Sequence, residues 1–234
     1  MPFEPVDNRR LYEQVASQIG ALIRKGEFVA GQRLPAERDL AKILSVSRPV
    51  VREAMIALEI AGLLEVRTGS GTFVKVKPAE PIEALNIGHS PSDILNARML
   101  IEGEVAALAA SRSSEEDLAA MAERIEEMTR DHEAGRAWHA ADLGFHVAIA
   151  RASGNIALAS VVERLWREQH APVFALLSER VRLNENWAAT LRCHQEILEA
   201  LRARNRKAAK DRMRAHLRQV LDVLTGVREM NGAE

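Results

Sequence analysis

Four side chains in the C-terminal part of the chain have types and spacings suited to binding a metal ion. Asp142 and His146 are four residues apart in a helical pattern, so both lie on one helix face. His194 and His216 lie in two later helical segments. If these helices pack as a bundle, the carboxylate and the three imidazoles can meet at one interior point. Such ligands suit a first-row divalent cation, with Zn²⁺ the first choice and Ni²⁺ or Mn²⁺ the alternatives.

The spacing alone leaves other interpretations open. A histidine in a helix is most often a surface residue or a hydrogen-bonded core residue, and Asp and His four apart also recur by chance. His139 extends the stripe of Asp142 and His146, either as a further ligand or as part of an exposed first turn. Cys193 adjoins His194 and points about 100° away around the helix, so we expect it in the core.

A second group of residues has the chemistry of DNA recognition. Arg48 and Arg52 follow Ser47 and are one helical turn apart, so both can face the same major groove. There an arginine fork matches the O6 and N7 atoms of guanine. Arg38, in the preceding predicted helix, can reach the same region or a phosphate. Each arginine taken alone is better explained as a solvated surface charge, and only their order along the chain favours DNA binding.

A glycine-rich turn follows these arginines. It consists of Gly69, Ser70 and Gly71 and separates two short strand patterns, over 63–67 and 72–76, so it predicts a β-hairpin. Glycine lets the backbone at such a tip approach a phosphate or the minor groove closely. The GxG spacing also occurs in nucleotide-binding loops, but here neither a following helix nor a Walker lysine accompanies it.

Three helical patterns precede this hairpin. They cover residues 11–26, 35–44 and 48–61. Pro35 is placed in the first turn of the second helix, whose apolar stripe would be Leu40, Ile43 and Leu44. Ser47 is the expected N-cap of the third. Three helices and a hairpin predict a winged helix-turn-helix over residues 1–77, in which the start of the third helix meets base edges.

The remainder of the chain has helical periodicity and almost no strand pattern. Helices are predicted near 92–112, 114–134, 137–152, 155–181, 187–203 and 205–229. Pro172 is expected to kink or split the fourth. Helices of this length must bury their apolar stripes on one another, which predicts an all-α antiparallel bundle over 91–234. The proline-containing stretch near residue 78 predicts a linker over 78–90, so the fold class is mostly α.

Composition agrees with this organisation. The 234 residues are 47% apolar and 28% charged, which excludes a disordered chain, and only 4% are aromatic, which favours helices over a β-sandwich. The single cysteine excludes an internal disulfide and a CxxC zinc site. Net charge is −1, divided into +3 for residues 1–77 and −4 for the rest. No apolar run approaches the ~18 residues of a membrane span, so we expect a cytoplasmic protein without a membrane partner.

The N-terminal motifs carry a family resemblance. GQRLPAERDLA at 31–41, VSR at 46–48, VREA at 51–54 and LEIAG at 58–62 resemble the GntR family of bacterial transcription regulators. The resemblance spans nearly all of residues 8–76. It implies that Arg38, Ser47, Arg48 and Arg52 contact bases and phosphates. It also implies that the turn at 69–71 is the tip of the wing.

The C-terminal motifs resemble the FCD type of effector domain found in the FadR subfamily. They are RMLIE at 98–102, DLGFH at 142–146, SGN at 153–155, HQEI at 194–197 and the late His216. The resemblance implies that Asp142, His146, His194 and His216 hold a metal. It also implies that Arg98 faces the carboxylate of an effector. From its helix pattern alone, which turns Leu100, Ile101, Val105 and Leu108 toward the core, Arg98 would instead extend to solvent.

The run at 58–74 and the C-terminal layout are most similar to regulators of hexuronate catabolism. The resemblance implies a metabolite-responsive regulator, expected to be a repressor, that binds palindromic operator DNA as a homodimer. Its effector would be a small carboxylate such as a hexuronate, with other hydroxy acids or dicarboxylic acids as alternatives. A helical-bundle metalloenzyme is disfavoured because no clear catalytic base accompanies the ligands. A purely structural metal is the third interpretation.

Overall fold

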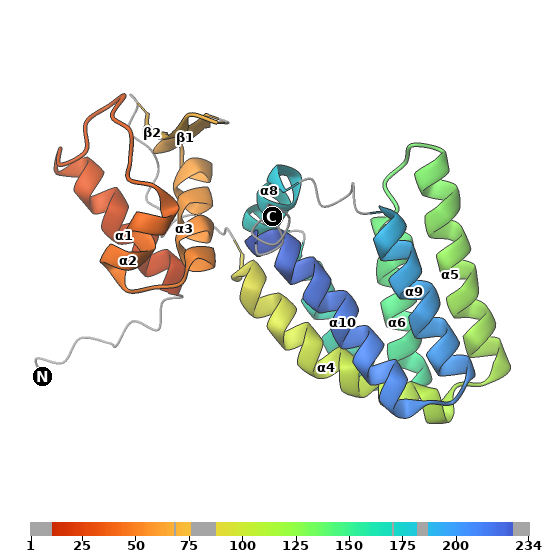
Figure 1. The fold of residues 1–234 in the computed structure, drawn as a ribbon. Coiled ribbons are helices and arrows are strands. Elements are labelled where there is room, and N and C mark those ends of the chain that lie inside the picture. Colours follow the sequence, from red (N-terminus) through yellow and green to blue (C-terminus); the bar gives the residue numbers. More distant parts are fainter. Residues whose placement is uncertain (1–10, 68, 76–87, 170, 182–186, 227–234) are drawn as a thin grey trace, which may run out of the picture. The chain divides into compact units, whose positions relative to one another are not determined.

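The computed structural model describes residues 11–67, 69–75, 88–169, 171–181 and 187–226, which form two compact units. The first unit extends to Pro91 and also takes in Ala171–Leu177, and the second contains the other described residues from Ser92 onward. The described chain is almost entirely helical apart from one short hairpin (Figure 1). This confirms the mostly α fold class. The sequence did not indicate that Ala171–Leu177 groups with the first unit.

The first unit is a winged helix-turn-helix, as predicted. Its elements are α1 (Leu11–Arg24), α2 (Glu37–Leu44), α3 (Arg48–Ile60), β1 (Leu64–Arg67) and β2 (Gly71–Val74). The two strands are antiparallel, with Leu64 opposite Val74 and Arg67 opposite Gly71. α1 packs on α3, and the apolar core between them includes Val15, Ile19, Met55 and Leu58. This packing fixes the position of α3 relative to α1.

Helix α2 differs from its prediction. It begins at Glu37, so Pro35 lies before the helix instead of in its first turn. The cause is an unpredicted pairing with β2, in which the N–H of Gly31 donates to Val74 O and that of Leu34 to Thr72 O, each at 2.9 Å. The chain before α2 is therefore extended along the hairpin. Ile43 is 71% exposed, so it is not part of the buried stripe that was expected.

The hairpin and the linker are only partly described. β2 begins one residue earlier than predicted and ends at Val74, while Val76 lies outside the described residues. Most of the expected linker over 78–90 also lies outside them. Its last residues are described, and the Gly88 carbonyl accepts a buried hydrogen bond from the Tyr12 hydroxyl at 2.6 Å. The chain is thus fastened to α1 just before the second unit begins.

The second unit is the predicted helical bundle. Its elements are α4 (Pro91–Arg112), α5 (Glu115–Glu133), α6 (His139–Ala152), α7 (Ile156–Glu168), α9 (Trp187–Arg202) and α10 (Arg206–Thr225), whereas most of α8 (Pro172–Arg180) groups with the first unit. α6 packs against α5 and α7, while α9 packs against α10 and α5. As predicted, Pro172 divides the fourth predicted helix, giving α7 and α8. None of the helices described is long and apolar enough to cross a membrane.

Side-chain caps fix where three of these helices begin. The Ser114 hydroxyl accepts from the Asp117 N–H at 3.1 Å, and the Asp117 carboxylate accepts from the Ser114 N–H at 2.9 Å. Asn155 and Asn205 cap α7 and α10 in a similar way. Each cap contributes about 1 kcal/mol. They fix the first residues of α5, α7 and α10.

Candidate metal centre and DNA-reading surface

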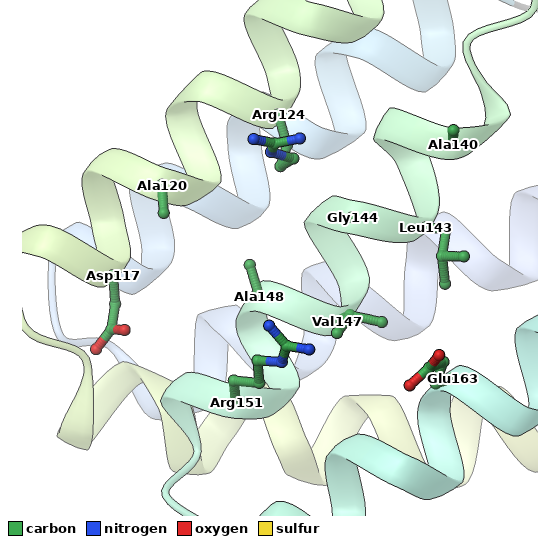
Figure 2. Close-up of a pocket in the computed structure, with 10 residues that line it drawn as sticks. All are labelled: Asp117, Ala120, Arg124, Ala140, Leu143, Gly144, Val147, Ala148, Arg151 and Glu163. Carbon is green, nitrogen blue, oxygen red and sulfur yellow. The ribbon is translucent and has the colours of Figure 1, made fainter.

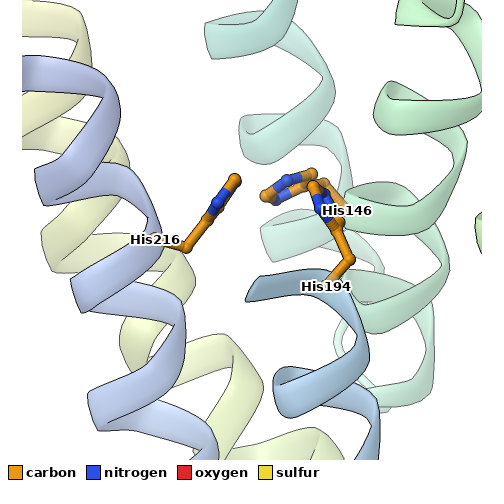
Figure 3. Close-up of side chains that lie close together, drawn as sticks. All are labelled: His146, His194 and His216. Carbon is orange, nitrogen blue, oxygen red and sulfur yellow. The ribbon is translucent and has the colours of Figure 1, made fainter. Parts of the chain in front are cut away.

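Three histidines from three helices converge inside the second unit. His146 of α6, His194 of α9 and His216 of α10 are all buried, and one ring nitrogen of each lies within 4.8 Å of the others. Figure 3 shows the three rings turned toward a common point. Their ring centroids are 4.6 to 5.5 Å apart. The structure therefore brings together histidines that are up to 70 positions apart in the chain.

Asp142 joins this cluster from the turn of α6 that precedes His146. Its Oδ1 lies 2.8 Å from Nε2 of His194 and 3.5 Å from Nε2 of His146. His139 is not part of the cluster among the residues described and instead stacks on Trp138, with ring centroids 5.2 Å apart. The four side chains expected to hold a metal are thus in one place, without His139.

The hydrogen bonds of two histidines define which nitrogen faces the cluster. Nδ1 of His194 lies 2.8 Å from the carbonyl oxygen of Thr190, which can only accept, so Nδ1 carries a hydrogen. If the ring is neutral, Nε2 carries a lone pair and no hydrogen. It nevertheless lies beside the Asp142 carboxylate, which also can only accept. Nε2 of His146 is fully buried and makes no hydrogen bond to the residues described. Two lone pairs and a carboxylate facing one point call for a cation, either a proton or a metal ion.

Arg98 lies beside this cluster and is fully engaged in it. The side chain is 2% exposed, so the solvent-exposed alternative suggested by its helix pattern is wrong. Nε donates to Glu102 Oε1 at 2.5 Å, and Nη1 donates to the side-chain oxygen of Gln169. The guanidinium also stacks over Trp166, 4.3 Å from the ring centroid. Leu100 is 65% exposed, because the Arg98–Glu102 pair occupies the inward stripe of α4.

The two buried acids of the site are ionised. Burial raises the pKa of Asp142, but its close contacts with the rings of His146 and His194 and the charges of those rings outweigh burial and bring the pKa well below its ordinary value. Burial also raises the pKa of Glu102. There the charges of Arg98 and His146 outweigh it and lower the pKa to about 2. The interior therefore presents two carboxylates to the imidazoles.

The pKa values of two of the imidazoles are shifted in opposite directions. Burial lowers the pKa of His146, but the carboxylates of Glu102 and Asp142 outweigh it and raise the pKa above its ordinary value. Burial lowers the pKa of His216 far below its ordinary value, and the charges of His194 and His146 lower it further. His216 is therefore neutral, which is the form that a metal ion requires.

Sequence reasoning missed four contributors to this site. Glu102 and Thr190 each lie four residues from a predicted site residue on the same helix, so helical spacing could have indicated them. Trp166 lies in α7 and Gln169 is the C-cap residue that follows it, and no spacing in the sequence connects them with Arg98. Only the packing of α7 in the bundle brings them there.

A separate hollow lies on the other face of α6, between α5 and α7. Figure 2 shows the side chains that line it. Its volume is about 560 Å³. Its charged lining residues are Asp117, Arg124, Arg151 and Glu163. Gly144 makes room for the Arg124 side chain, since a Cβ there would lie 2.8 Å from Arg124 Cδ. With two acids and two arginines the lining has no net charge, so it does not favour an ion of either sign.

The predicted base-contacting residues lie at and before the start of α3. Ser47 and Arg48 are exposed, and Ser47 stands at the N-cap position, although its side chain accepts no capping hydrogen bond. Arg52 is half-buried, and its Nε lies 3.2 Å from Glu37 Oε2 on α2. Arg38 is exposed on α2. Glu37 of α2 thus contacts Arg52 of α3 and helps to orient its guanidinium.

The tip of the wing has the backbone that its glycines suggested. Gly69 and Gly71 have φ values of +73° and +106°, which side-chain-bearing residues rarely adopt. A Cβ at Gly71 would lie 2.6 Å from Nε of Arg33, whereas a Cβ at Gly69 would meet open space. Ser70 is exposed, and its N–H donates to Arg67 O at 2.8 Å across the turn.

Comparisons with known proteins agree with both units. The model of bacterial regulatory proteins of the gntR family matches residues 11–74, and the FCD domain model matches residues 93–219. The chain is 37% identical to the Exu regulon transcriptional regulator of Escherichia coli (strain K12), over 92% of this chain and 84% of that one. It is 34% identical to the Uxu operon transcriptional regulator of the same strain, over 91% and 86%.

A solved structure shares the fold. E. coli McbR/YncC matches with a TM-score of 0.52 at 23% identity, over 94% of this chain and 99% of that one. The two domain models together account for the helix-turn-helix and for the bundle. The chain therefore belongs to the GntR family of bacterial regulatory proteins with an FCD domain, and it is a DNA-binding transcription regulator, not an enzyme.

Proposed function

We propose that this regulator is a metabolite-responsive repressor of carbon catabolism whose FCD domain binds a divalent metal and a small carboxylate effector. A sugar acid of the hexuronate type is the first choice, supported by the similarity to regulators named for the Exu regulon and the Uxu operon. Other hydroxy acids are the alternative. The observation that carries the proposal is the buried cluster of three histidines beside a buried arginine.

The side chains present fit a metal ion. Asp142, His146, His194 and His216 would hold it, and Zn²⁺ suits three imidazoles and one carboxylate. The support is the buried Nε2 of His146, which makes no hydrogen bond to any residue that the structure describes, together with the Nε2 of His194 beside a carboxylate. When bound, the metal would supply a Lewis-acidic position for one carboxylate oxygen of the effector.

Arg98 would hold the same effector from the other side. Its bonds to Glu102 and Gln169 use one N–H each of Nε, Nη1 and Nη2, and Nη2 also lies 3.4 Å from Nδ1 of His146, so the second N–H of Nη1 is the one left for an effector oxygen. Charge-assisted bonds from a planar guanidinium to a carboxylate are among the stronger ones in proteins. The stacking on Trp166 keeps the guanidinium plane fixed while it acts.

Operator binding would use two copies of the chain. Arg38, Ser47, Arg48 and Arg52, with the wing tip at 69–71, would contact one half-site of a palindrome, and a homodimer would supply the second set. Such a regulator acts on bacterial DNA and hence in the cytoplasm. Effector binding would bias the placement of the two DNA-binding domains.

A ligand screen on zinc-loaded protein tests the proposal. A ligand that binds only the folded state raises the melting temperature. We expect D-glucuronate or D-galacturonate to raise it, with L-lactate and succinate as comparison acids, and we expect the active acid to change operator affinity in a gel shift. Stabilisation by zinc without a response to any acid would instead indicate a purely structural metal.

The Arg98→Lys variant is expected to bind the active acid more weakly while keeping its zinc. Lysine preserves the positive charge beside Glu102 but loses the planar guanidinium, so the effector keeps the charge attraction and loses the directed hydrogen bond. Alanine is less suitable, because an unpaired buried carboxylate costs about 3–5 kcal/mol of stability. Calorimetry with the acid found in the screen measures the change. Unchanged affinity would show that the effector lies elsewhere.

A further inference from the structure

We infer that Glu102 is a positioning residue that couples the metal ligand His146 to Arg98. The inference rests on the proposed function, because it concerns the same site. Glu102 lies in the middle of α4, is 2% exposed and is absent from the set of residues expected to touch metal or effector. Its carboxylate lies between one group that would bind the metal and one that would bind the effector.

The two oxygens of Glu102 are divided between these neighbours. Oε2 lies 2.5 Å from Nδ1 of His146, and Oε1 lies 2.5 Å from Nε of Arg98. A weaker contact of 3.4 Å joins Oε2 to Nη2 of Arg98. One buried side chain therefore contacts both an imidazole of α6 and a guanidinium of its own helix.

The contact with His146 selects one form of that imidazole. A carboxylate only accepts hydrogen bonds, so Nδ1 of His146 must carry the hydrogen. Nε2 is then the nitrogen left for a metal, and it is the one that faces Asp142 at 3.5 Å. An outer carboxylate that holds the far nitrogen of a liganding histidine is typical of metal sites and orients the ring.

The same carboxylate also holds the guanidinium of Arg98 in place. Arg98 has its head buried, with Glu102 on one edge, Gln169 beside it and Trp166 under its face. If Glu102 shifts, the ring of His146 and the fork of Arg98 must both shift. A rigid Glu102 therefore sets the distance between the metal and the effector-binding cation.

The Glu102→Gln substitution separates this role from simple packing. Glutamine has nearly the same shape, but only one of its two terminal atoms accepts hydrogen bonds. Its oxygen can serve His146 or Arg98, and its NH₂ group then faces a donor of the other. Either orientation breaks one contact. The Glu102→Asp substitution is less informative, because the shorter side chain withdraws the carboxylate from both His146 and Arg98.

Zinc affinity measured by competition with a chromophoric chelator gives the main readout. We expect Glu102→Gln to bind Zn²⁺ about 10- to 100-fold more weakly than the wild type, which is the usual effect of losing such an outer contact. The matched control is Glu104→Gln, two residues along α4, where the side chain is 56% exposed and pairs with Lys210. It makes the same chemical change and should leave zinc affinity unaltered.

Nitrogen NMR of the histidine rings supplies an independent measurement on the wild type. In zinc-loaded protein we expect His146 to carry its hydrogen on Nδ1 and to bind zinc through Nε2. In metal-free Glu102→Gln we expect the preference for the Nδ1–H form to decrease. If the variant does not fold, the wild-type spectrum decides, and a ring protonated on Nε2 would overturn the role of Glu102.

The outcomes also separate this inference from the proposed function. If the wild type binds no zinc, the proposed metal site itself is wrong. If the wild type and Glu102→Gln bind zinc equally tightly, the metal site stands and the role of Glu102 is overturned. Equal losses in Glu102→Gln and Glu104→Gln would likewise overturn it, since they would reflect the change of charge on α4.

Discussion

The His194→Ala variant is expected to lose a divalent metal from the FCD domain, and with it the stabilisation that the metal provides. His194 sits at the centre of the cluster, with Nε2 2.8 Å from Asp142 and its ring centroid 4.6 Å from that of His216. A metal held only by the folded state at 1,000 times its dissociation constant adds about 4 kcal/mol to the free energy of unfolding. Elemental analysis and thermal unfolding, with and without a chelator, measure both effects.

The His139→Ala variant is the matched control for this experiment. His139 lies on α6 like His146 but stacks on Trp138 outside the cluster, so its loss should leave the metal content unchanged. The chelator separates metal from packing, because His194→Ala also loses a buried contact with Asp142. For each variant, the quantity compared is therefore the difference in stability between the zinc-loaded and the chelator-treated protein. Stoichiometric zinc in His194→Ala, or none in reloaded wild type, would contradict the site.

The sequence predicted which four side chains meet, but not the residues that contact and orient them. Asp142 and His146 followed from a spacing of four on one helix, and bundle packing made it possible for His194 and His216 to join them, but only the resemblance selected this arrangement over the alternatives. All four side chains meet because each lies on the buried, otherwise apolar face of its helix, which the bundle turns inward. Gln169 could not be predicted, because its contact with Arg98 spans 71 positions and depends on how α7 packs.

The fold was predictable where local pattern and packing agree. Helical spacing and Pro172 gave the bundle, but Ile43 and Leu100 were assigned to buried stripes and are exposed. In α4 the reason is plain, since a buried ion pair takes the inward positions that apolar residues usually fill. The pairing of Gly31 and Leu34 with β2 was also missed, because a short extended segment has no periodicity to detect.

Arg48→Ala and Arg52→Ala are expected to abolish the discrimination between operator and random DNA. Arg48 is exposed in the first turn of α3, and Arg52 lies one turn later, oriented by Glu37 at 3.2 Å. A lost bidentate contact with guanine costs about 1–3 kcal/mol, or about 5- to 150-fold in affinity. The losses should add roughly in the double variant, while binding to random DNA falls much less.

Gel shifts with an operator selected from random-sequence DNA by the wild-type protein measure this loss. Arg130→Ala is the matched control, because it removes an exposed arginine from α5 and changes the net charge equally. Base readout predicts a loss of the specificity ratio at every salt concentration, whereas a contact with phosphate alone would weaken operator and random DNA alike and lower the salt dependence. Folded Arg48→Ala and Arg52→Ala variants that retain wild-type operator affinity would show that α3 does not read the bases through these residues.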